Sequence, residues 1–230
     1  MGRRKDTGSR RSACPHCGHP LSARDLMPVF SWVFATGKCR YCKTPVSVFY
    51  PLTEVLTIGL CLLFFWVYGY TVHSVILVFL APVLVAILMI DFQHLIIPNG
   101  LNAVIALAAV LAVVTADIGY NMPPVDSMES YAAKALAGGL VYFSLAFMLE
   151  VVFTRLLKKP ALGGGDIKFF GAAGLWLGVG ALPGFLMISG LSGIVLALIW
   201  RKITGEEHFP FGPALIVAFI VLLAGRVTIF

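Results

Sequence analysis

Two aspartates carry the chemistry that this sequence offers. Asp91 ends one apolar segment and Asp166 stands just before another, so both fall at the edge of a hydrocarbon layer. A carboxylate at that depth is costly and indicates a functional site. Two carboxylates brought together share one proton: the ionised one takes a proton from water, and the protonated one donates toward a carbonyl oxygen. The pair therefore predicts hydrolysis of the aspartic protease type.

Each aspartate also has a simpler interpretation. Asp91 suits the end of a helix at a membrane interface, and Asp166 suits the positive end of a helix dipole. The glycines Gly163, Gly164 and Gly165 favour function, because they let an extended substrate backbone approach the acid; a flexible hinge is the alternative. Lys168 is typical of an interfacial anchor, but it is close enough in sequence to influence Asp166.

Two further acids lie in apolar segments. Glu150 stands near the end of one segment, and no motif explains it; it can snorkel to the interface, form an ion pair or contact a substrate. Glu54 opens the first apolar segment, where an acid in a first helical turn is favourable. A more specific interpretation is that the Glu54 carboxylate faces a bound cation or amine.

Cysteines form a second candidate site near the N-terminus. Two Cys-x₂-Cys pairs can each direct two thiolates toward one tetrahedral metal ion. We expect zinc rather than a redox pair or unused thiols, because disulfides are disfavoured in a reducing cytoplasm. Four thiolates leave no open coordination position, so the zinc is expected to be structural and to stabilise a module with few apolar residues. The expected ligands are Cys14, Cys17, Cys39 and Cys42.

The composition indicates a polytopic membrane protein. Of the 230 residues, 59% are hydrophobic and only 12% are charged, which excludes an ordinary soluble domain. The polar residues 1–50 form the expected cytoplasmic zinc-binding module, and residues 51–230 form the expected transmembrane domain. No P-loop, dinucleotide-binding fingerprint or Gly-x-Ser-x-Gly elbow occurs in the sequence.

Turn residues divide the apolar part into segments of nearly the length that crosses a bilayer, about 20 residues. We therefore predict an all-α fold with about seven transmembrane helices. The expected spans are 52–71, 74–91, 101–118, 132–153, 167–181, 183–200 and 213–230.

Basic residues predict the orientation in the membrane. With a cytoplasmic N-terminus, all 17 Lys and Arg residues except Lys134 and Arg226 fall in cytoplasmic segments, and the opposite loop at 119–131 is acidic. The basic cytoplasmic segments are 1–51, 154–168 and 201–212. In this topology Asp91 and Asp166 lie at the same, cytoplasmic, face. The net charge of +6 is then an orientation signal, and we expect no nucleic-acid partner.

The order of these features resembles the bacterial type IV prepilin peptidases over nearly the whole chain. The cysteine pairs enclose a Met27–Trp32 segment, and Tyr50-Pro51 precedes Glu54, as in that family. Asp91 with Pro98 and Asn99 is similar to its first catalytic-aspartate motif. The run from Gly163 to Lys168 resembles its second, the GxGD signature. Pro210-Phe211-Gly212-Pro213 resembles the motif before its last span.

The resemblance implies a GxGD-type intramembrane aspartic protease of the bacterial inner membrane, with two activities. It would cut the basic leader from type IV prepilins or pseudopilins at the cytoplasmic face and then methylate the new N-terminal amine with S-adenosylmethionine. Asp91 and Asp166 would be the catalytic pair. Glu54 is a candidate for methyl transfer by its position. The residues that support the two aspartate motifs would be Gly163, Gly164, Gly165, Lys168, Pro98 and Asn99.

One departure from the family bears on methylation. Family members usually carry a further transmembrane helix and an Arg-Leu-Pro-like segment before the cysteines, whereas a short polar segment precedes Cys14 here. We expect seven spans rather than eight, with the peptidase chemistry intact. Three alternatives stay open: a peptidase without methylation, a zinc-ribbon membrane scaffold without catalysis, and a transporter whose acids relay protons. Neither the substrate pilin nor the oligomeric state follows from the sequence.

Overall fold

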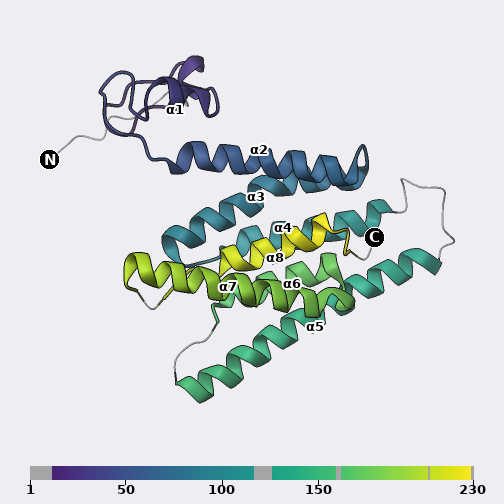
Figure 1. Ribbon diagram of the computed structural model, residues 1–230. Coiled ribbons are helices and arrows are strands. Elements are labelled where there is room, and N and C mark those ends of the chain that lie inside the picture. Colours follow the sequence, from purple (N-terminus) through teal and green to yellow (C-terminus); the bar gives the residue numbers. More distant parts are fainter. Residues whose placement is uncertain (1–11, 117–125, 159–161, 207, 229–230) are drawn as a thin grey trace. The chain divides into compact units, whose positions relative to one another are not determined.

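The computed structural model describes residues 12–116, 126–158, 162–206 and 208–228 (Figure 1). Within these residues the chain is helical and forms no strand, which confirms the all-α prediction. The elements are η1 (Ala23–Leu26), α1 (Phe30–Phe34), α2 (Phe49–Tyr68), α3 (Val72–His94), α4 (Asn99–Ala116), α5 (Asp126–Leu157), α6 (Gly164–Leu177), η2 (Val179–Ala181), α7 (Leu182–Thr204) and α8 (Gly212–Ala224). The chain divides into two compact units, Met1–Ile58 and Gly59–Phe230.

Each of the seven expected spans corresponds to one of the helices α2 to α8. Five spans are long and apolar enough to cross a membrane: α2, α3, α4, the Tyr131–Leu156 part of α5, and Val179–Thr204. Helix α8 is apolar but has only 13 residues, and α6 has 14. The chain is therefore a multi-pass membrane protein.

Several predicted boundaries are wrong. Helix α5 begins at Asp126, inside the loop expected at 119–131, and residues 117–125 of that loop lie outside the described residues. Helix α6 stops at Leu177 rather than 181, because Gly178 adopts a φ of 68° that breaks the helix. Helix α8 ends at Ala224, where Gly225 follows, and not at 230.

The short helix α6 lies in the middle of the second unit. It packs along α5 and also contacts α4 and α8. Its aromatic side chains Phe169, Phe170 and Trp176 are buried. The backbones of α5 and α6 touch, because a Cβ atom added at Gly174 would lie 2.5 Å from the carbonyl oxygen of Gly138. Such close approach between small residues is how membrane helices gain packing energy.

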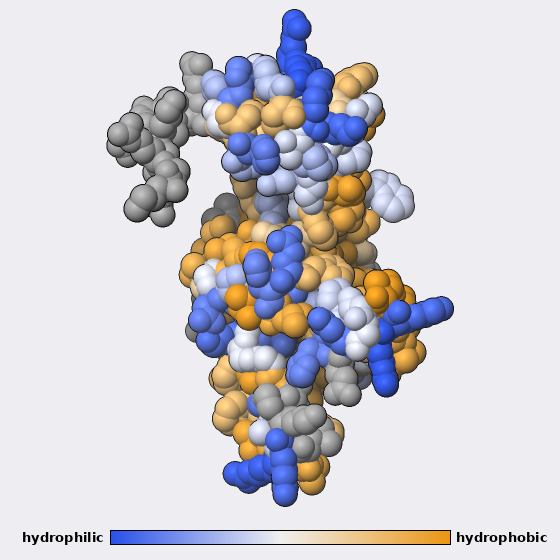
Figure 2. All heavy atoms as spheres, turned by 90° about the vertical axis from the view of Figure 1, so that its left-hand side faces the viewer, coloured by the Kyte–Doolittle hydropathy of each residue, from blue (hydrophilic) through white to orange (hydrophobic). Residues whose placement is uncertain are grey.

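Charged residues gather at one end of this bundle, where α3, α5 and α7 end and α4, α6 and α8 begin. Figure 2 looks onto this end and shows hydrophilic side chains among the apolar ones. Exposed basic residues stand at or just after the ends of α5 and α7 and near the start of α6: Arg155, Lys158, Lys168, Arg201 and Lys202. The motifs of both aspartates lie at the same end.

Candidate active site and metal centre

Asp91 lies in the last turn of α3 and is only 4% exposed. The backbone N–H of Gly212, the first residue of α8, donates to Asp91 Oδ2 at 2.7 Å. A Cβ atom at position 212 would lie 2.7 Å from the same oxygen, so no larger residue fits there without moving the carboxylate. The positive end of α8 therefore holds this buried acid in place.

Asp166 lies in the first turn of α6 and is half-buried. The N–H of Gly163, which precedes the helix, donates to Asp166 Oδ2 at 3.2 Å. Helix α6, which carries Asp166, packs on α8, whose first residue holds Asp91, and the charge of Asp91 lies within electrostatic range of Asp166. Asp91 is thus enclosed, whereas Asp166 keeps part of its surface exposed.

The residues Gly163 to Gly165 form a glycine turn before Asp166, and this turn packs against the residues just before α4. A Cβ atom at Gly165 would lie 2.7 Å from the carbonyl oxygen of Ile97, so a larger residue would push the two segments apart. The side-chain amide of Asn102 donates to the carbonyl oxygen of Gly165 at 2.9 Å, and Asn102 is buried. Asn102 was not among the residues predicted from the sequence, although an amide inside an apolar helix indicates a required hydrogen bond.

The remaining motif residues join the two aspartate segments. Lys168 Nζ donates to Asn99 Oδ1 at 2.7 Å, and both side chains are exposed. The carbonyl oxygen of Pro98 accepts the N–H groups of Leu101 and Asn102, which starts α4. Lys168 therefore ties the second motif to the first.

Glu150 is a functional candidate that the sequence left unexplained. Its carboxylate accepts a hydrogen bond from the backbone N–H of Leu162 and another, of 2.8 Å, from Thr154 Oγ1. Leu162 immediately precedes the glycine turn. Glu150 is thus connected to the segment that leads into Asp166.

An apolar cavity of about 410 Å³ lies between α3 and α4, and a second of about 230 Å³ lies among α5, α6 and α7. The second cavity is lined by Leu162 and Phe211, the residues next to Gly163 and Gly212. Both of these glycines donate a hydrogen bond to a candidate catalytic carboxylate. Apolar space therefore adjoins the aspartate pair.

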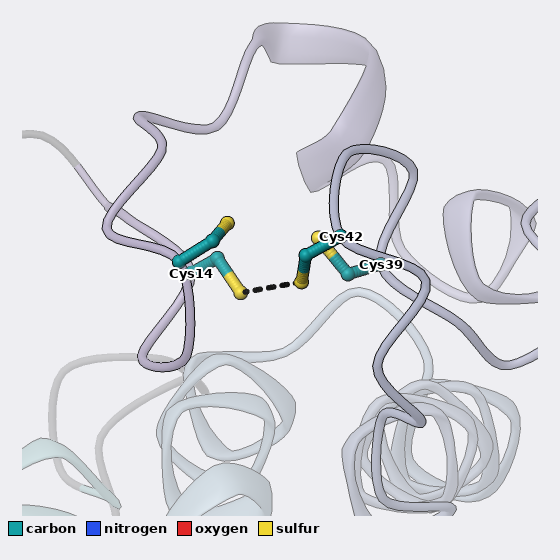
Figure 3. A group of neighbouring side chains, drawn as sticks. Cys14, Cys39 and Cys42 are labelled. Atoms are coloured by element: carbon teal, nitrogen blue, oxygen red, sulfur yellow. Dashed lines mark hydrogen bonds between the residues drawn. The ribbon is translucent and has the colours of Figure 1, made fainter.

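The four predicted metal ligands form one cluster in the first unit (Figure 3). The sulfur atoms of Cys14, Cys17, Cys39 and Cys42 all lie within 4.8 Å of one another, and the Cys14 and Cys42 sulfurs are 4.0 Å apart. Four thiolates around zinc, with Zn–S bonds of about 2.3 Å, require sulfur separations of about 3.8 Å. The cluster fits a tetrahedral metal ion.

The two cysteine pairs adopt the same backbone turn. The N–H of Gly18 donates to the Cys14 carbonyl oxygen at 2.8 Å, and the N–H of Lys43 donates to that of Cys39 at 2.9 Å. Gly18 and Lys43 both have a positive φ, 69° and 60°. The turn also presents N–H groups to sulfur: those of Cys17 and His16 lower the pKa of the Cys14 thiol. Thiolates are the metal-binding form of cysteine.

The second turn stabilises its thiolate in the same way. Hydrogen bonds from the hydroxyl and backbone N–H of Thr44 lower the pKa of Cys42 to about 6.

Two other acids of the first unit form contacts within it. Asp25, from the segment between the turns, accepts a hydrogen bond from Tyr41 and pairs with Arg40 at 3.4 Å. The N–H of Val29 donates to Glu54 at 2.7 Å, so this carboxylate is engaged by the backbone of its own unit.

Comparisons with known proteins divide the chain into an N-terminal part and a longer second part, much as the structure does. Residues 3–68 match the model of the bacterial peptidase A24 N-terminal domain, and residues 77–198 match that of the type IV leader peptidase family. No solved structure matches the chain.

Several curated relatives are named prepilin leader peptidase/N-methyltransferase. The one from Neisseria gonorrhoeae is 32% identical over 90% of this chain and 68% of its own length. The one from Aeromonas hydrophila is 34% identical over 94% of this chain and 72% of its own, and the one from Legionella pneumophila is 30% identical over 93% and 71%.

Proposed function

Because this chain belongs to the type IV leader peptidase family, we propose that it removes the leader from type IV prepilins or pseudopilins and methylates the new N-terminal residue. The predicted family resemblance is confirmed by both family models. The relatives carry the two activities in their names, and the aspartate pair supplies the chemistry of the first.

The geometry of Asp91 and Asp166 is the observation that carries the peptidase. The two carboxylates come from different helices, interact electrostatically, and are each held by a glycine N–H. In the proposed reaction one carboxylate accepts a proton from water, while the other donates a proton toward the carbonyl oxygen of the scissile peptide bond. Either carboxylate can take either role, so the two roles are proposed for the pair.

The proposed membrane orientation follows the basic residues. Arg155, Lys158, Arg201 and Lys202 are exposed at the bundle end that holds the aspartates, which supports placing that end in the cytoplasm of the bacterial inner membrane. Residues 1–11 and Lys159, which also entered the orientation prediction, lie outside the described residues. The apolar helix of a prepilin would lie in the lipid layer, with its leader at this face.

The cysteine cluster is proposed as a structural zinc site in a module of residues 1–50, followed by a peptidase domain of residues 51–230. Four thiolates occupy every position of a tetrahedral ion, so zinc there would supply folding energy. Methylation requires S-adenosylmethionine, and Glu54 stays a prediction for that step. The hydrogen bond from the Val29 N–H also gives Glu54 a structural role within the first unit.

Intact mass spectrometry of a prepilin tests both activities. The purified protein in nanodiscs is incubated with prepilin and S-adenosylmethionine. Loss of the leader together with one added methyl group is the expected result. Loss of the leader alone identifies a peptidase without methylation. An unchanged prepilin beside folded, metal-loaded protein would contradict the proposal and favour the scaffold or the transporter.

A further inference from the structure

Two consecutive backbone N–H groups end on two different carboxylates. The N–H of Leu162 donates to Glu150 Oε2, and the N–H of Gly163 donates to Asp166 Oδ2 at 3.2 Å. Glu150 comes from α5 and Asp166 from α6. One short stretch of backbone therefore connects an acid of unknown use to a proposed catalytic acid.

Glu150 is built into its position. It is half-buried in the apolar part of α5, and Thr154 Oγ1, one helical turn further on, donates to its other oxygen at 2.8 Å. Hydrogen bonds to an ionised acceptor are roughly twice as strong as neutral ones. A carboxylate at this depth in the membrane costs free energy. There must therefore be a reason why Glu150 is kept there and binds Leu162.

The glycine turn gives that reason. Gly163 and Gly164, at the boundary of α6, offer little resistance to backbone rotation, and a Cβ atom at Gly164 would meet nothing within 4 Å. The turn must therefore be held from outside. Asn102 holds its far end through the carbonyl oxygen of Gly165 at 2.9 Å, and Glu150 holds its near end through Leu162.

We infer that Glu150 is a positioning residue for Asp166: by binding the N–H of Leu162 it fixes the direction of the neighbouring Gly163 N–H, which holds the Asp166 carboxylate. The inference rests on the proposed peptidase function. Glu150 touches neither substrate nor reacting atoms in this role. Its loss frees the Leu162 N–H, so the backbone can rotate at Leu162 and withdraw the Gly163 donor from Asp166.

The test measures prepilin cleavage by Glu150→Ala and Glu150→Gln in nanodiscs, with zinc content and thermal unfolding recorded alongside. We expect Glu150→Ala to lower kcat by about tenfold or more with KM changed less than about threefold, because misplacement affects the reaction more than substrate binding. Glu150→Gln keeps an acceptor oxygen for Leu162 and is expected to retain kcat within about threefold. Glu206→Ala, an exposed acid in the loop after α7, is the matched control.

A third variant keeps the test decisive when Glu150→Ala does not fold. Glu150→Asp retains the charge but shortens the reach toward Leu162, so positioning predicts that Asp is slower than Gln. A role that depends on charge alone predicts the opposite order, and that order would overturn the inference. Unchanged kcat in Glu150→Ala would overturn it too. Wild-type protein that leaves prepilin intact overturns the proposed function itself, which separates the two failures.

Discussion

The cysteine site and the aspartate site are held in opposite ways. Each cysteine pair is shaped by hydrogen bonds inside its own short turn, such as Gly18 to Cys14 and Lys43 to Cys39. The aspartate site depends on bonds between distant parts of the chain: Gly212 lies 121 positions from Asp91, and Asn102 lies 63 positions from Gly165. One site is local and the other is a product of the whole helical bundle.

This difference predicts how each site fails. A local turn needs its metal for stability, because few other contacts replace it. A site assembled from several helices fails when the helices shift by a fraction of an ångström, even though the protein stays folded. The two sites should therefore respond to different substitutions.

Metal removal has the largest expected effect. A structural zinc site contributes on the order of 10 kcal/mol to folding, so a strong chelator should unfold residues 12–46. Hydrogen exchange followed by mass spectrometry would show loss of protection there, while α3 to α8 keep theirs. Cys42→Ser in the full chain should act like the chelator. Protection that persists in the module after complete loss of metal would contradict the zinc assignment.

Gly212→Val should disable the aspartate site alone. The new side chain starts 2.7 Å from Asp91 Oδ2, and the carboxylate must move or lose its donor. We expect prepilin cleavage to fall by about a hundredfold, as when a preorganised donor is lost, with zinc content unchanged. Gly59→Ala is the control, because a Cβ atom there meets nothing within 4 Å. Wild-type cleavage by Gly212→Val would show that Asp91 does not need this fit.

Gly174→Ala tests the bundle without touching either site directly. A Cβ atom at Gly174 would lie 2.5 Å from a backbone oxygen of α5, so the two helices must separate. Overpacking of this kind costs about 2 kcal/mol and should lower the unfolding temperature in detergent. Gly190→Ala, a helical glycine with open space around it, should leave that temperature unchanged or raise it. Equal unfolding temperatures for both variants would argue against close α5–α6 contact.

Substitutions in the two cysteine turns have the smallest expected effects. Gly18→Ala places a Cβ atom at a φ of 69° without any collision, so only backbone strain of about 1 kcal/mol weakens zinc binding, about fivefold. Lys43→Gly relieves the same strain but adds freedom to the unfolded chain, so zinc affinity should change less than about twofold. Competition with a chromophoric chelator measures both. A stronger loss in Lys43→Gly than in Gly18→Ala would contradict this account.

The cysteine site was predicted from the sequence more completely than the aspartate site. Spacing alone indicated the four cysteine ligands, because two residues between cysteines define one turn. The aspartates were identified as costly acids, and the helix that carries each was predicted, but no pattern in the sequence contains the pairing of Asp91 with Gly212. The contacts of Asn102 and Glu150 were missed for the same reason, since their partners are backbone groups far away in the chain.

The errors in helix length have a related cause. The end of helix α6 was predicted four residues too late because its apolar run continues past Gly178, and hydropathy does not report a backbone break. Helix α6 is also shorter than a typical span of about 20 residues, and it packs against α4, α5 and α8.

Cleavage of prepilin by Asp166→Asn, with the zinc content of the same sample, tests the central claim most directly. The substitution keeps the size of the side chain and removes its ability to exchange a proton. We predict that the leader stays on the prepilin through hours of incubation while the protein binds one zinc ion per chain. Leader removal at the wild-type rate by this variant would contradict the assignment of catalysis to the aspartate pair.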